Sequence, residues 1–326
     1  MPGLKLSAVV PCYNEWGGMR ELLRRVGLIC QACVGDSYEV VLVNDGSKDA
    51  TWQIMRELSL SDKHVVAINL SRNYGHQLAL SAGLQMCRGE RVFILDADLQ
   101  DPPEILPQMM ARMDDGCDVV FGLRVRREGE TAFKKASAHA FYRLLNRLVD
   151  IEIPADTGDF RLMSRKSVDI LNSMPEHHRF IRGMVSWIGL RQESVPYQRA
   201  PRFAGETNYP LPKMLRFAAD AITGFSVRPL QMASYFGACF GAAALLLLLY
   251  VFVYHFVGYT VSGWTSLAVI VLALGSVQLL VAGVMGEYLG RLYMQSKGRP
   301  LFVIQEIVSS PELSAAADRR EKAVER

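Results

Sequence analysis

The sequence predicts an α/β domain with a mostly parallel sheet and helices on both of its faces, followed by two transmembrane helices. Two observations carry this prediction. Over about the first 125 residues, apolar runs typical of buried strands alternate with helical stretches, and the connections between them are short. From about residue 230, the chain contains two long apolar stretches without Lys, Arg, Asp or Glu.

The order of the predicted elements indicates where a ligand would bind. Strands are expected at Leu6–Val10, Val40–Val43, Val65–Leu70, Arg91–Leu95 and Val119–Phe121. Helices are expected between them, among others at Arg20–Cys30, Thr51–Leu60 and Gln77–Met86. Residues 160–208 show a mixed pattern with a basic cluster near Arg199 and Arg202. In open α/β sheets, ligands bind at the carboxyl ends of strands, so residues that follow a strand are the first candidates for a site.

The two uncharged stretches, residues 232–257 and 264–286, are each long enough to cross about 30 Å of hydrocarbon as a helix. A core helix of a soluble protein is the alternative, but such a helix seldom runs so far without a charge. Basic residues lie before the first stretch and after the second, whereas residues 255–263 contain no Lys or Arg. The positive-inside rule therefore predicts a multi-pass protein of the inner (cytoplasmic) membrane with both chain ends in the cytoplasm.

The overall charge points to no macromolecular partner. Lys and Arg exceed Asp and Glu by three over 326 residues, which neither favours nor excludes nucleic acid, and we expect no nucleic-acid partner. The six cysteines are scattered. The one C-x-x-C pair, Cys30 and Cys33, lacks the second pair that a zinc site needs, so we interpret all six as reduced thiols.

The segment after the fourth predicted strand carries the strongest functional signal. Asp96, Asp98 and Gln100 occupy alternate positions, and in an extended segment such side chains point to one face. Their oxygens could then meet at one point and bind a hard divalent cation, Mg²⁺ or Mn²⁺, which commonly bridges a substrate pyrophosphate. A solvated acidic turn is the alternative, because the Asp-x-Asp pattern alone is a weak motif.

The ends of the first two strands are expected to flank one crevice. Asp45 could accept a hydrogen bond from an N–H of a nucleobase, and Tyr13 could stack or hydrogen-bond at the base or ribose. The Asn-Asp-Gly-Ser pattern around Asp45 is in any case that of a tight turn that caps a helix, and ligand binding would be an additional use. The first strand–helix turn contains no dinucleotide or P-loop glycine motif, which weakens those two interpretations.

Further charged residues lie in the loops after the third and fifth strands and beyond. Arg72 could counter the charge of a phosphate, and we interpret His76 as a helix-start residue rather than a catalytic group. Arg124 ends the fifth strand, and its planar fork suits phosphate, although a solvated basic surface is the alternative. Asp159 lies in a glycine-containing turn that by itself means little.

Five segments in order resemble family-2 glycosyltransferases of the GT-A fold. The resemblance is strongest to the polyprenyl-phosphate branch, which contains dolichol-phosphate mannose synthases and bacterial bactoprenol glucosyltransferases. The similar segments are Val10–Glu15 (VPCYNE), Asn44–Ser47 (NDGS), Arg72–Gly75 (RNYG), Asp96–Glu104 (DADLQDPPE) and Gly158–Leu162 (GDFRL). The paired apolar stretches and the sequence GEYLGR at 286–291 also resemble the bacterial members, so the resemblance covers about residues 5–308.

The resemblance implies an inverting transfer of a hexose, from UDP-glucose by preference, to undecaprenyl phosphate, with Mg²⁺ or Mn²⁺ as cofactor. It implies catalytic roles for Asp98 and Asp159 and metal binding by Asp96, Asp98 and Gln100. The implied nucleotide-sugar ligands are Pro11, Tyr13, Asn14, Glu15, Asp45 and Arg72. The implied ligands of the acceptor phosphate are Arg124, Lys134, Lys135 and Arg202.

Composition and the resemblance together suggest a domain organisation. We expect a cytosolic GT-A catalytic domain over residues 1–208 and an amphipathic segment over residues 209–230, which lies in the membrane interface or forms an ordinary surface helix. A two-helix transmembrane hairpin over 231–293 and a cytosolic tail over 294–326 complete the chain.

Two features depart from common patterns of the family. The chain has Gly-Glu-Thr-Asn at 205–208 where members often have Gly-Glu-Ser-Lys, which puts a charge role of that loop in doubt. It lacks the Gln-x-x-Arg-Trp motif of processive synthases, which favours a single transfer. A phosphate monoester is largely dianionic at pH 7 and needs little help from a base, so the chemistry favours a positioning role for Asp159 over proton removal.

Several alternatives stay open at this point. The sugar donor could instead be a UDP-N-acetylhexosamine, a UDP-aminoarabinose derivative or GDP-mannose. A non-catalytic membrane adaptor that keeps the nucleotide-binding residues is a second class of protein, although the complete set of Asp96, Asp98 and Gln100 favours an enzyme. The sequence also allows for a homo-oligomer.

Overall fold

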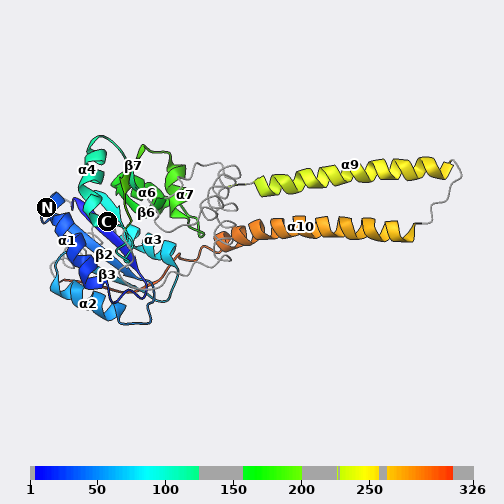
Figure 1. Ribbon diagram of the computed structural model, residues 1–326. Coiled ribbons are helices and arrows are strands. Elements are labelled where there is room, and N and C mark those ends of the chain that lie inside the picture. The colour runs from blue at the N-terminus through cyan, green and yellow to red at the C-terminus, as the bar shows by residue number, and fades with distance from the viewer. Residues whose placement is uncertain (1–3, 125–156, 200–225, 227, 257–262, 311–326) are drawn as a thin grey trace, which may run out of the picture. The chain divides into compact units, whose positions relative to one another are not determined.

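The computed structural model describes residues 4–124, 157–199, 226, 228–256 and 263–310 (Figure 1). The chain forms two compact units. The first contains a β-sheet with its covering helices, and the second, which includes Leu211–Gly298, contains two long helices.

Among the described residues, eight strands form one sheet in the order β7-β5-β6-β4-β1-β2-β3-β8. The strands are β1 (Leu6–Cys12), β2 (Tyr38–Asn44), β3 (Val65–Leu70), β4 (Arg91–Ile94), β5 (Val119–Arg124), β6 (Thr157–Ser164), β7 (Gln192–Tyr197) and β8 (Ile304–Ser309). β6 and β8 run antiparallel to their neighbours, and the other strands are parallel to one another. The prediction of a mostly parallel sheet is confirmed.

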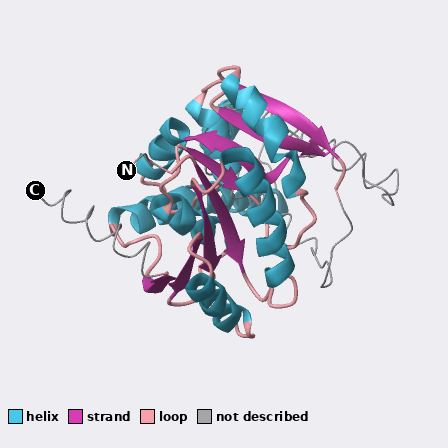
Figure 2. Ribbon diagram, turned by 90° about the vertical axis from the view of Figure 1, so that its left-hand side faces the viewer, coloured by secondary structure: helices cyan, strands magenta, loops and turns pink. Residues whose placement is uncertain are grey.

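Helices cover both faces of this sheet (Figure 2). They are α1 (Met19–Val34), α2 (Thr51–Ser61), α3 (His76–Met86), the 3₁₀ turn η1 (Pro103–Ile105), α4 (Leu106–Asp114), α6 (Arg165–Ser173) and α7 (Ile181–Ile188). α1 packs with α2 and α4 on one face, whereas α3 and α6 contact each other on the opposite face. There α3 approaches β1 so closely that a Cβ at Gly83 would lie 2.4 Å from Val9 Cγ1.

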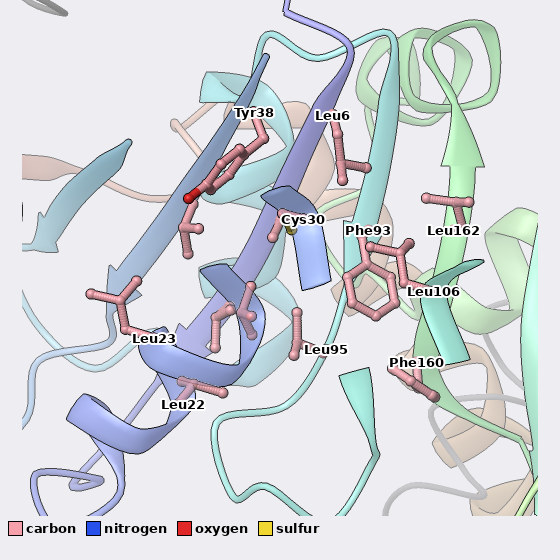
Figure 3. Packing of buried hydrophobic residues seen from close by; sticks show 14 of the residues in the cluster. Leu6, Leu22, Leu23, Cys30, Tyr38, Phe93, Leu95, Leu106, Phe160 and Leu162 are labelled. Carbon is pink, nitrogen blue, oxygen red and sulfur yellow. The ribbon is translucent and has the colours of Figure 1, made fainter. Parts of the chain in front are cut away.

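The core between α1, α4 and the sheet follows directly from the sequence pattern (Figure 3). Buried residues of α1 recur every three or four positions, which is the period of one helix face, and they meet alternate residues of β1 such as Leu6. Phe93 of β4 packs against Phe160 of β6, with ring centroids 5.4 Å apart. Burial of each such large apolar side chain stabilises the fold by about 1.5–3 kcal/mol.

The antiparallel direction of β6 brings its first residues to the edge where the parallel strands end. Ile94, the last residue of β4, pairs with Arg161 of β6. The residues that follow β4 therefore lie beside the beginning of β6, where Asp159 is located. This arrangement assembles one site from segments far apart in the sequence.

β8 returns to the sheet after the two long helices and pairs antiparallel with β3. The Ser71 N–H also donates to the Val303 carbonyl at 3.0 Å, so the β8 segment supports the loop that follows β3. The sequence pattern did not predict this strand.

The second unit contains α9 (Arg228–Phe256) and α10 (Trp264–Ser296), on which the two predicted apolar stretches fall. Both are long and apolar enough to cross a membrane. They leave large apolar side chains exposed, such as Leu245 at 70% and Leu279 at 76%, which a core helix of a soluble protein would bury. The Tyr288 hydroxyl donates to the Ser226 carbonyl at 2.6 Å, which links α10 to the residues just before α9.

Candidate active site

The turn after β4 places the Asp-x-Asp pair at the strand-end edge of the sheet. β4 ends at Ile94, and the chain turns at 97–99, so the predicted extended conformation of this segment is wrong. Leu99 adopts a positive φ of 58°, and Asp98 Oδ1 accepts a hydrogen bond from the Gln100 N–H at 3.1 Å. A short aspartate side chain that accepts a hydrogen bond from the backbone two residues ahead favours a turn instead of a strand.

His76 joins two carboxylates across the site. Its Nε2 lies 3.5 Å from Asp96 Oδ1 and 3.3 Å from Asp159 Oδ2. Burial lowers the pKa of His76, but the hydrogen bond to Asp159 and the charge of Asp96 outweigh it and raise this pKa to about 9. The imidazole is therefore a cation at neutral pH in this arrangement.

Asp159 is a buried carboxylate that side chains hold from several directions. Gln77 Nε2 donates to Asp159 Oδ2 at 2.8 Å, and Arg161 Nη2 donates to Oδ1 at 3.4 Å. Burial alone raises the pKa of Asp159, but the hydrogen bond from His76 and the charges of Arg182 and Arg161 outweigh it. The pKa of Asp159 thus lies well below its usual range, and the group is a poor base at neutral pH.

Asp96 has a buried oxygen that faces the His76 ring at 3.5 Å. Within the described residues, its Oδ1 is buried and accepts no hydrogen bond. Burial, which outweighs the lowering effect of the His76 charge, together with the nearby carboxylates, raises the pKa of Asp96 to about 6. Burial of a carboxylate oxygen without a hydrogen-bond donor is costly, and a nearby cation offsets this cost, as the His76 ring does in part here.

The donors after β4 suit a hard divalent cation, since they are carboxylate and amide oxygens. Across the described residues, no group of three or more His, Cys, Asp or Glu is placed to hold a metal ion. Mg²⁺ usually binds one or two protein carboxylates together with substrate phosphates and water, so the Asp96 and Asp98 pair is compatible with a site that the substrate completes.

Asp101 is the centre of a second cluster at the same edge. Its side chain is fully buried and accepts a hydrogen bond from the Tyr197 hydroxyl at 2.5 Å. Arg124 Nη2 lies 3.6 Å from Asp101 Oδ2, and Arg199 Nε lies 3.4 Å from Oδ1. Arg199 also reaches Asp98, with 3.8 Å between Nη2 and Oδ2.

Arg124 lies at the end of β5, where the sequence places it, but its side chain is only 15% exposed. Its Nε donates to the Tyr197 hydroxyl at 3.0 Å. A Cβ at Gly158 would lie 2.6 Å from Arg124 Nη2, so the glycine leaves room for the guanidinium. Contact of Arg124 with an acceptor phosphate stays a prediction, and the described geometry commits its charge to Asp101.

Asp45, which follows β2, fixes the backbone of the loop after β3 through two hydrogen bonds. Its Oδ1 accepts the Tyr74 N–H at 2.7 Å, and its Oδ2 accepts the Gly75 N–H at 2.9 Å. Burial raises the pKa of Asp45, which these two backbone donors only partly offset. Gly46 has φ of 64°, and a Cβ there would lie 2.5 Å from the Asn73 N atom, so only glycine fits against this loop.

The loop after β1 carries the other predicted nucleotide ligands. Pro11 is buried within β1, whereas the Tyr13 side chain is 43% exposed. Asn14 has a positive φ of 56° and accepts a hydrogen bond from the Lys48 N–H at 3.0 Å. The Glu15 N–H donates to Thr51 Oγ1 at 2.9 Å. These bonds tie the loop to the one after β2, so the two loops form one rim of the site.

Arg72 is exposed, and its guanidinium stacks 4.1 Å from the centre of the Tyr74 ring. Lys134, Lys135 and Arg202, which were predicted to bind the acceptor phosphate, lie outside the described residues.

Sequence reasoning missed several residues of this site. His76 does begin α3, as interpreted, but its ring also contacts Asp96 and Asp159. Tyr197 gave no local signal, and Arg161 was noted only as part of the segment Gly158–Leu162. For His76 and Gln77, the available hint was a polar dipeptide at a helix start after a strand, because the carboxyl ends of strands meet at one edge.

Comparison with known proteins identifies the enzyme family of this chain. Residues 7–171 match the model of "Glycosyl transferase family 2". The chain is 45% identical over 304 residues to "Uncharacterized glycosyltransferase YkcC" of Bacillus subtilis (strain 168), covering 93% of this chain and 94% of the relative. The chain therefore belongs to glycosyltransferase family 2 and has the GT-A fold.

Two further similar proteins carry more specific names. "Bactoprenol glucosyl transferase" of Shigella phage SfV is 38% identical over 303 residues, which cover 93% of this chain and 98% of the relative. A "Prophage bactoprenol glucosyl transferase homolog" of Escherichia coli (strain K12) is 36% identical over 305 residues, 93% and 99% of the two chains. Among solved structures, glucosyl-3-phosphoglycerate synthase from Mycobacterium tuberculosis, crystallised with Mn²⁺, UDP and phosphoglyceric acid, superposes with a TM-score of 0.46 at 18% identity, covering 67% of this chain and 76% of that one.

Proposed function

We propose that the protein transfers glucose from a nucleotide-sugar, UDP-glucose by preference, to polyprenyl (undecaprenyl) phosphate and inverts the anomeric configuration. The observation that carries this proposal is the similarity to bactoprenol glucosyl transferases, which spans 93% of this chain and 98% of the phage SfV relative. It extends over the catalytic unit and both long apolar helices, so it supports the acceptor lipid as well as the chemistry.

Asp96, Asp98 and Gln100 are the residues that would hold Mg²⁺ or Mn²⁺. The buried oxygen of Asp96 that accepts no hydrogen bond and the raised pKa of this carboxylate support the assignment, because a bound cation would stabilise the ionised carboxylate. When bound, the cation neutralises the charge that develops on the departing nucleoside diphosphate.

Asp159 supports the reaction as an ionised hydrogen-bond acceptor. The acceptor phosphate has its second pKa near 6, so it is already a nucleophile at pH 7. The pKa of Asp159 lies too low for efficient proton removal. We assign it to a hydroxyl of the transferred sugar, which it would orient for attack from the opposite face.

The nucleotide is proposed to bind along the rim formed by the loops after β1, β2 and β3. Tyr13 is exposed enough to stack on a base or ribose. Pro11, Asn14 and Glu15 shape the pocket wall, and Asp45 reaches a nucleobase N–H through the remaining lone pairs of its carboxylate. Arg72 would lie beside the diphosphate.

The acceptor phosphate is proposed to bind at the opposite end of the site, beyond β5. Arg124 is the described member of this group, and Lys134, Lys135 and Arg202 are its other proposed members. These cations would offset the repulsion between the dianionic acceptor and the anionic diphosphate, which amounts to several kcal/mol at close range.

A membrane hairpin at the inner (cytoplasmic) membrane, with the catalytic unit in the cytosol, is the proposed placement of the chain. β8 follows α10 but belongs to the same sheet as β1 to β4, so both ends of the helix pair lie in one compartment. The chain between them must then cross the membrane an even number of times. The basic flanks favour the cytosol as that compartment.

The decisive experiment is a panel of nucleotide-sugars with undecaprenyl phosphate and the purified full-length protein, scored for lipid-linked sugar. We expect product with UDP-glucose, none in excess EDTA and none with Asp98→Asn. Product with UDP-N-acetylhexosamine, UDP-aminoarabinose or GDP-mannose alone would correct the donor. No lipid-linked product from any donor would overturn the proposal.

Topology is tested separately with an impermeant thiol reagent on intact cells. A cysteine at position 260 should be labelled from outside, and a cysteine near the C-terminus should not. The reverse pattern would invert the orientation, and equal labelling of both positions would contradict the hairpin.

A further inference from the structure

Gln77 forms hydrogen bonds on two opposite sides of its amide group. Its Nε2 donates to Asp159 Oδ2 at 2.8 Å, and its Oε1 accepts the Ile181 N–H at 2.9 Å. Gln77 lies in the first turn of α3, Asp159 lies in β6, and Ile181 is the first residue of α7. One side chain therefore joins three elements that are far apart in the sequence.

The chemistry of the two partners fixes the orientation of this amide. An ionised carboxylate only accepts hydrogen bonds, and a backbone N–H only donates one. The NH₂ group of Gln77 must then face Asp159, and its carbonyl oxygen must face α7. An ionised glutamate at this position would lack the donor, and a lysine would lack the acceptor.

Gln77 contributes something to Asp159 that the neighbouring cations do not. His76 Nε2 and Arg161 Nη2 lie 3.3 Å and 3.4 Å from the carboxylate, whereas the bond from Gln77 measures 2.8 Å. The cations keep Asp159 ionised. The shorter bond from a neutral amide adds no charge, and it fixes the direction of Oδ2 because hydrogen bonds weaken steeply away from linear geometry.

α7 gives Gln77 a firm attachment. Ile181 and Met184 are buried, and α7 contacts both α6 and β6. The first N–H groups of a helix have no partner within that helix, and Gln77 accepts one of them. Arg182, in the same turn, carries a charge that lowers the pKa of Asp159. The start of α7 therefore acts on Asp159 both through a hydrogen-bonded side chain and through a charge.

We propose that Gln77 is a positioning residue, which orients the carboxylate of Asp159 toward the transferred sugar by tying it to the start of α7. The inference rests on the proposed role of Asp159 in holding a hydroxyl of that sugar. It adds that α7, which supplies no assigned substrate ligand, belongs to the frame of the active site. Loss of the tie should then slow the transfer and leave the binding of the donor almost unchanged.

The test uses the purified full-length protein in detergent and the lipid transfer assay, with whichever nucleotide-sugar gives lipid-linked product. Gln77→Met removes both hydrogen bonds and keeps a similar side-chain length. It should lower kcat roughly 3- to 10-fold and change the KM values for donor and lipid less than about twofold. Gln85→Met is the matched control, because Gln85 is exposed on the same helix, and it should keep wild-type kinetics.

A double-mutant cycle shows whether Gln77 acts through Asp159. In an Asp159→Asn background, Gln77→Met should lower kcat by less than about a further twofold, because no carboxylate is left to orient. An undiminished effect in that background would overturn the proposal, because Gln77 would then act on another group. A raised KM for the donor with an unchanged kcat would overturn it as well.

A second pair of variants tests the tie to α7. Ile181→Pro and Ile181→Ala both shorten the same buried side chain, but only proline removes the N–H that Gln77 accepts. Proline is tolerated at the first position of a helix, so the two thermal melts should be similar. Ile181→Pro should have a kcat roughly 2- to 5-fold below that of Ile181→Ala, and equal values would overturn the role of α7. The double-mutant cycle decides the proposal if the proline variant does not fold.

Asp159→Asn by itself separates the failure of the proposed role of Asp159 from that of the positioning role. Full kcat in Asp159→Asn would refute the role of Asp159 and, with it, that of Gln77. A lowered kcat in Asp159→Asn together with wild-type kcat in Gln77→Met would leave the role of Asp159 standing and refute that of Gln77. A thermal melt of each variant verifies that it is folded.

Discussion

Asp45 and Asp159 are both buried carboxylates at the strand-end edge of one sheet, yet the protein holds them in different ways. Asp45 accepts two backbone N–H groups of the loop after β3, whereas Asp159 is held by the side chains of Gln77, Arg161 and His76. The pKa of Asp45 is raised, because burial outweighs its two amide donors. The pKa of Asp159 is lowered, because hydrogen bonding and cations outweigh burial.

This difference separates two tasks within one site. Backbone donors fix the shape of a loop and add no net charge, which suits the wall of a nucleotide pocket. Cationic side chains keep a carboxylate ionised, which suits a group that must accept a hydrogen bond from a sugar at any physiological pH. A third carboxylate, Asp96, has a buried oxygen that accepts no hydrogen bond and is assigned to the metal.

The largest effect on the transfer rate is expected at Asp98, a carboxylate that is assigned to the metal. Asp98→Asn should lower the rate of transfer by at least about 10²- to 10³-fold, because a key electrostatic contribution to the transition state is lost. The fold should survive, since the asparagine oxygen can still accept the Gln100 N–H. Rate assays and thermal melts test this. Asp114→Asn is the control, because Asp114 is an exposed surface partner of Arg91. Full activity of Asp98→Asn would refute the assignment.

The next prediction contrasts the two carboxylates kinetically. Asp159→Asn should lower kcat roughly 10- to 150-fold, since a hydrogen bond to a charged group contributes about 1.5–3 kcal/mol. It should change the KM for the nucleotide-sugar little. Asp45→Asn should instead raise that KM, because the amide group cannot accept both N–H donors of the loop. Steady-state kinetics with varied donor and lipid distinguish the two patterns, and an exchange of the patterns would mean that the two regions are assigned wrongly.

A third prediction compares a change in the backbone that surrounds Asp45 with a change in a side chain that holds Asp159. Gly46→Ala forces a Cβ against the backbone at Asn73 and a side chain into positive φ, which should destabilise the protein by about 1–3 kcal/mol and weaken nucleotide binding. Gln77→Leu removes the donor to Asp159 and should lower kcat by a smaller factor than Asp159→Asn. Thermal melts measure the stability, and titrations with the sugar donor measure nucleotide binding. If Gly46→Ala changed neither of these and lowered only kcat, the assignment of the two regions would be contradicted.

The smallest expected effect is on stability against acid, where the two carboxylates should act with opposite sign. The folded pKa of Asp159 lies below the unfolded value near 3.9, so its contribution is present above pH 4 and is lost as the pH falls further. The folded pKa of Asp45 is raised, so its ionisation costs stability, and acid relieves this cost. From pH 5 to 3, Asp159→Asn should lose less stability than wild type and Asp45→Asn more. Tryptophan fluorescence melts measure this, and parallel curves for all three proteins would contradict it.

Much of the sheet was predictable because its signals are local. β1 to β5 are runs of apolar residues between short turns, and α1, α2 and α3 fall on the expected stretches. The position of the Asp-x-Asp pair at a strand end followed from the same pattern. Its conformation did not, because the bond from Gln100 N–H to Asp98 and the positive φ of Leu99 form a turn.

The partners within the site were not predictable, because they depend on long-range pairing. The proximity of Asp96, His76 and Asp159 requires that β6 run antiparallel to β4 in one register. The commitment of Arg124 to Asp101 requires Tyr197 of β7 beside it. β8 escaped prediction because Ile304–Ser309 is short and its partner strand lies near the other end of the chain.

The late position of β8 has a consequence for biosynthesis. The chain emerges from the ribosome N-terminus first, so β3 is made long before the strand that covers its outer edge. Until α9 and α10 have been synthesised, the backbone groups along that edge have no strand to pair with, and an open edge is a template for aggregation. A ribosome that stops after α10 would release a chain with every acidic residue assigned to the site and an unfinished sheet. Synthesis of the strand that completes the described sheet therefore follows synthesis of the two long apolar helices.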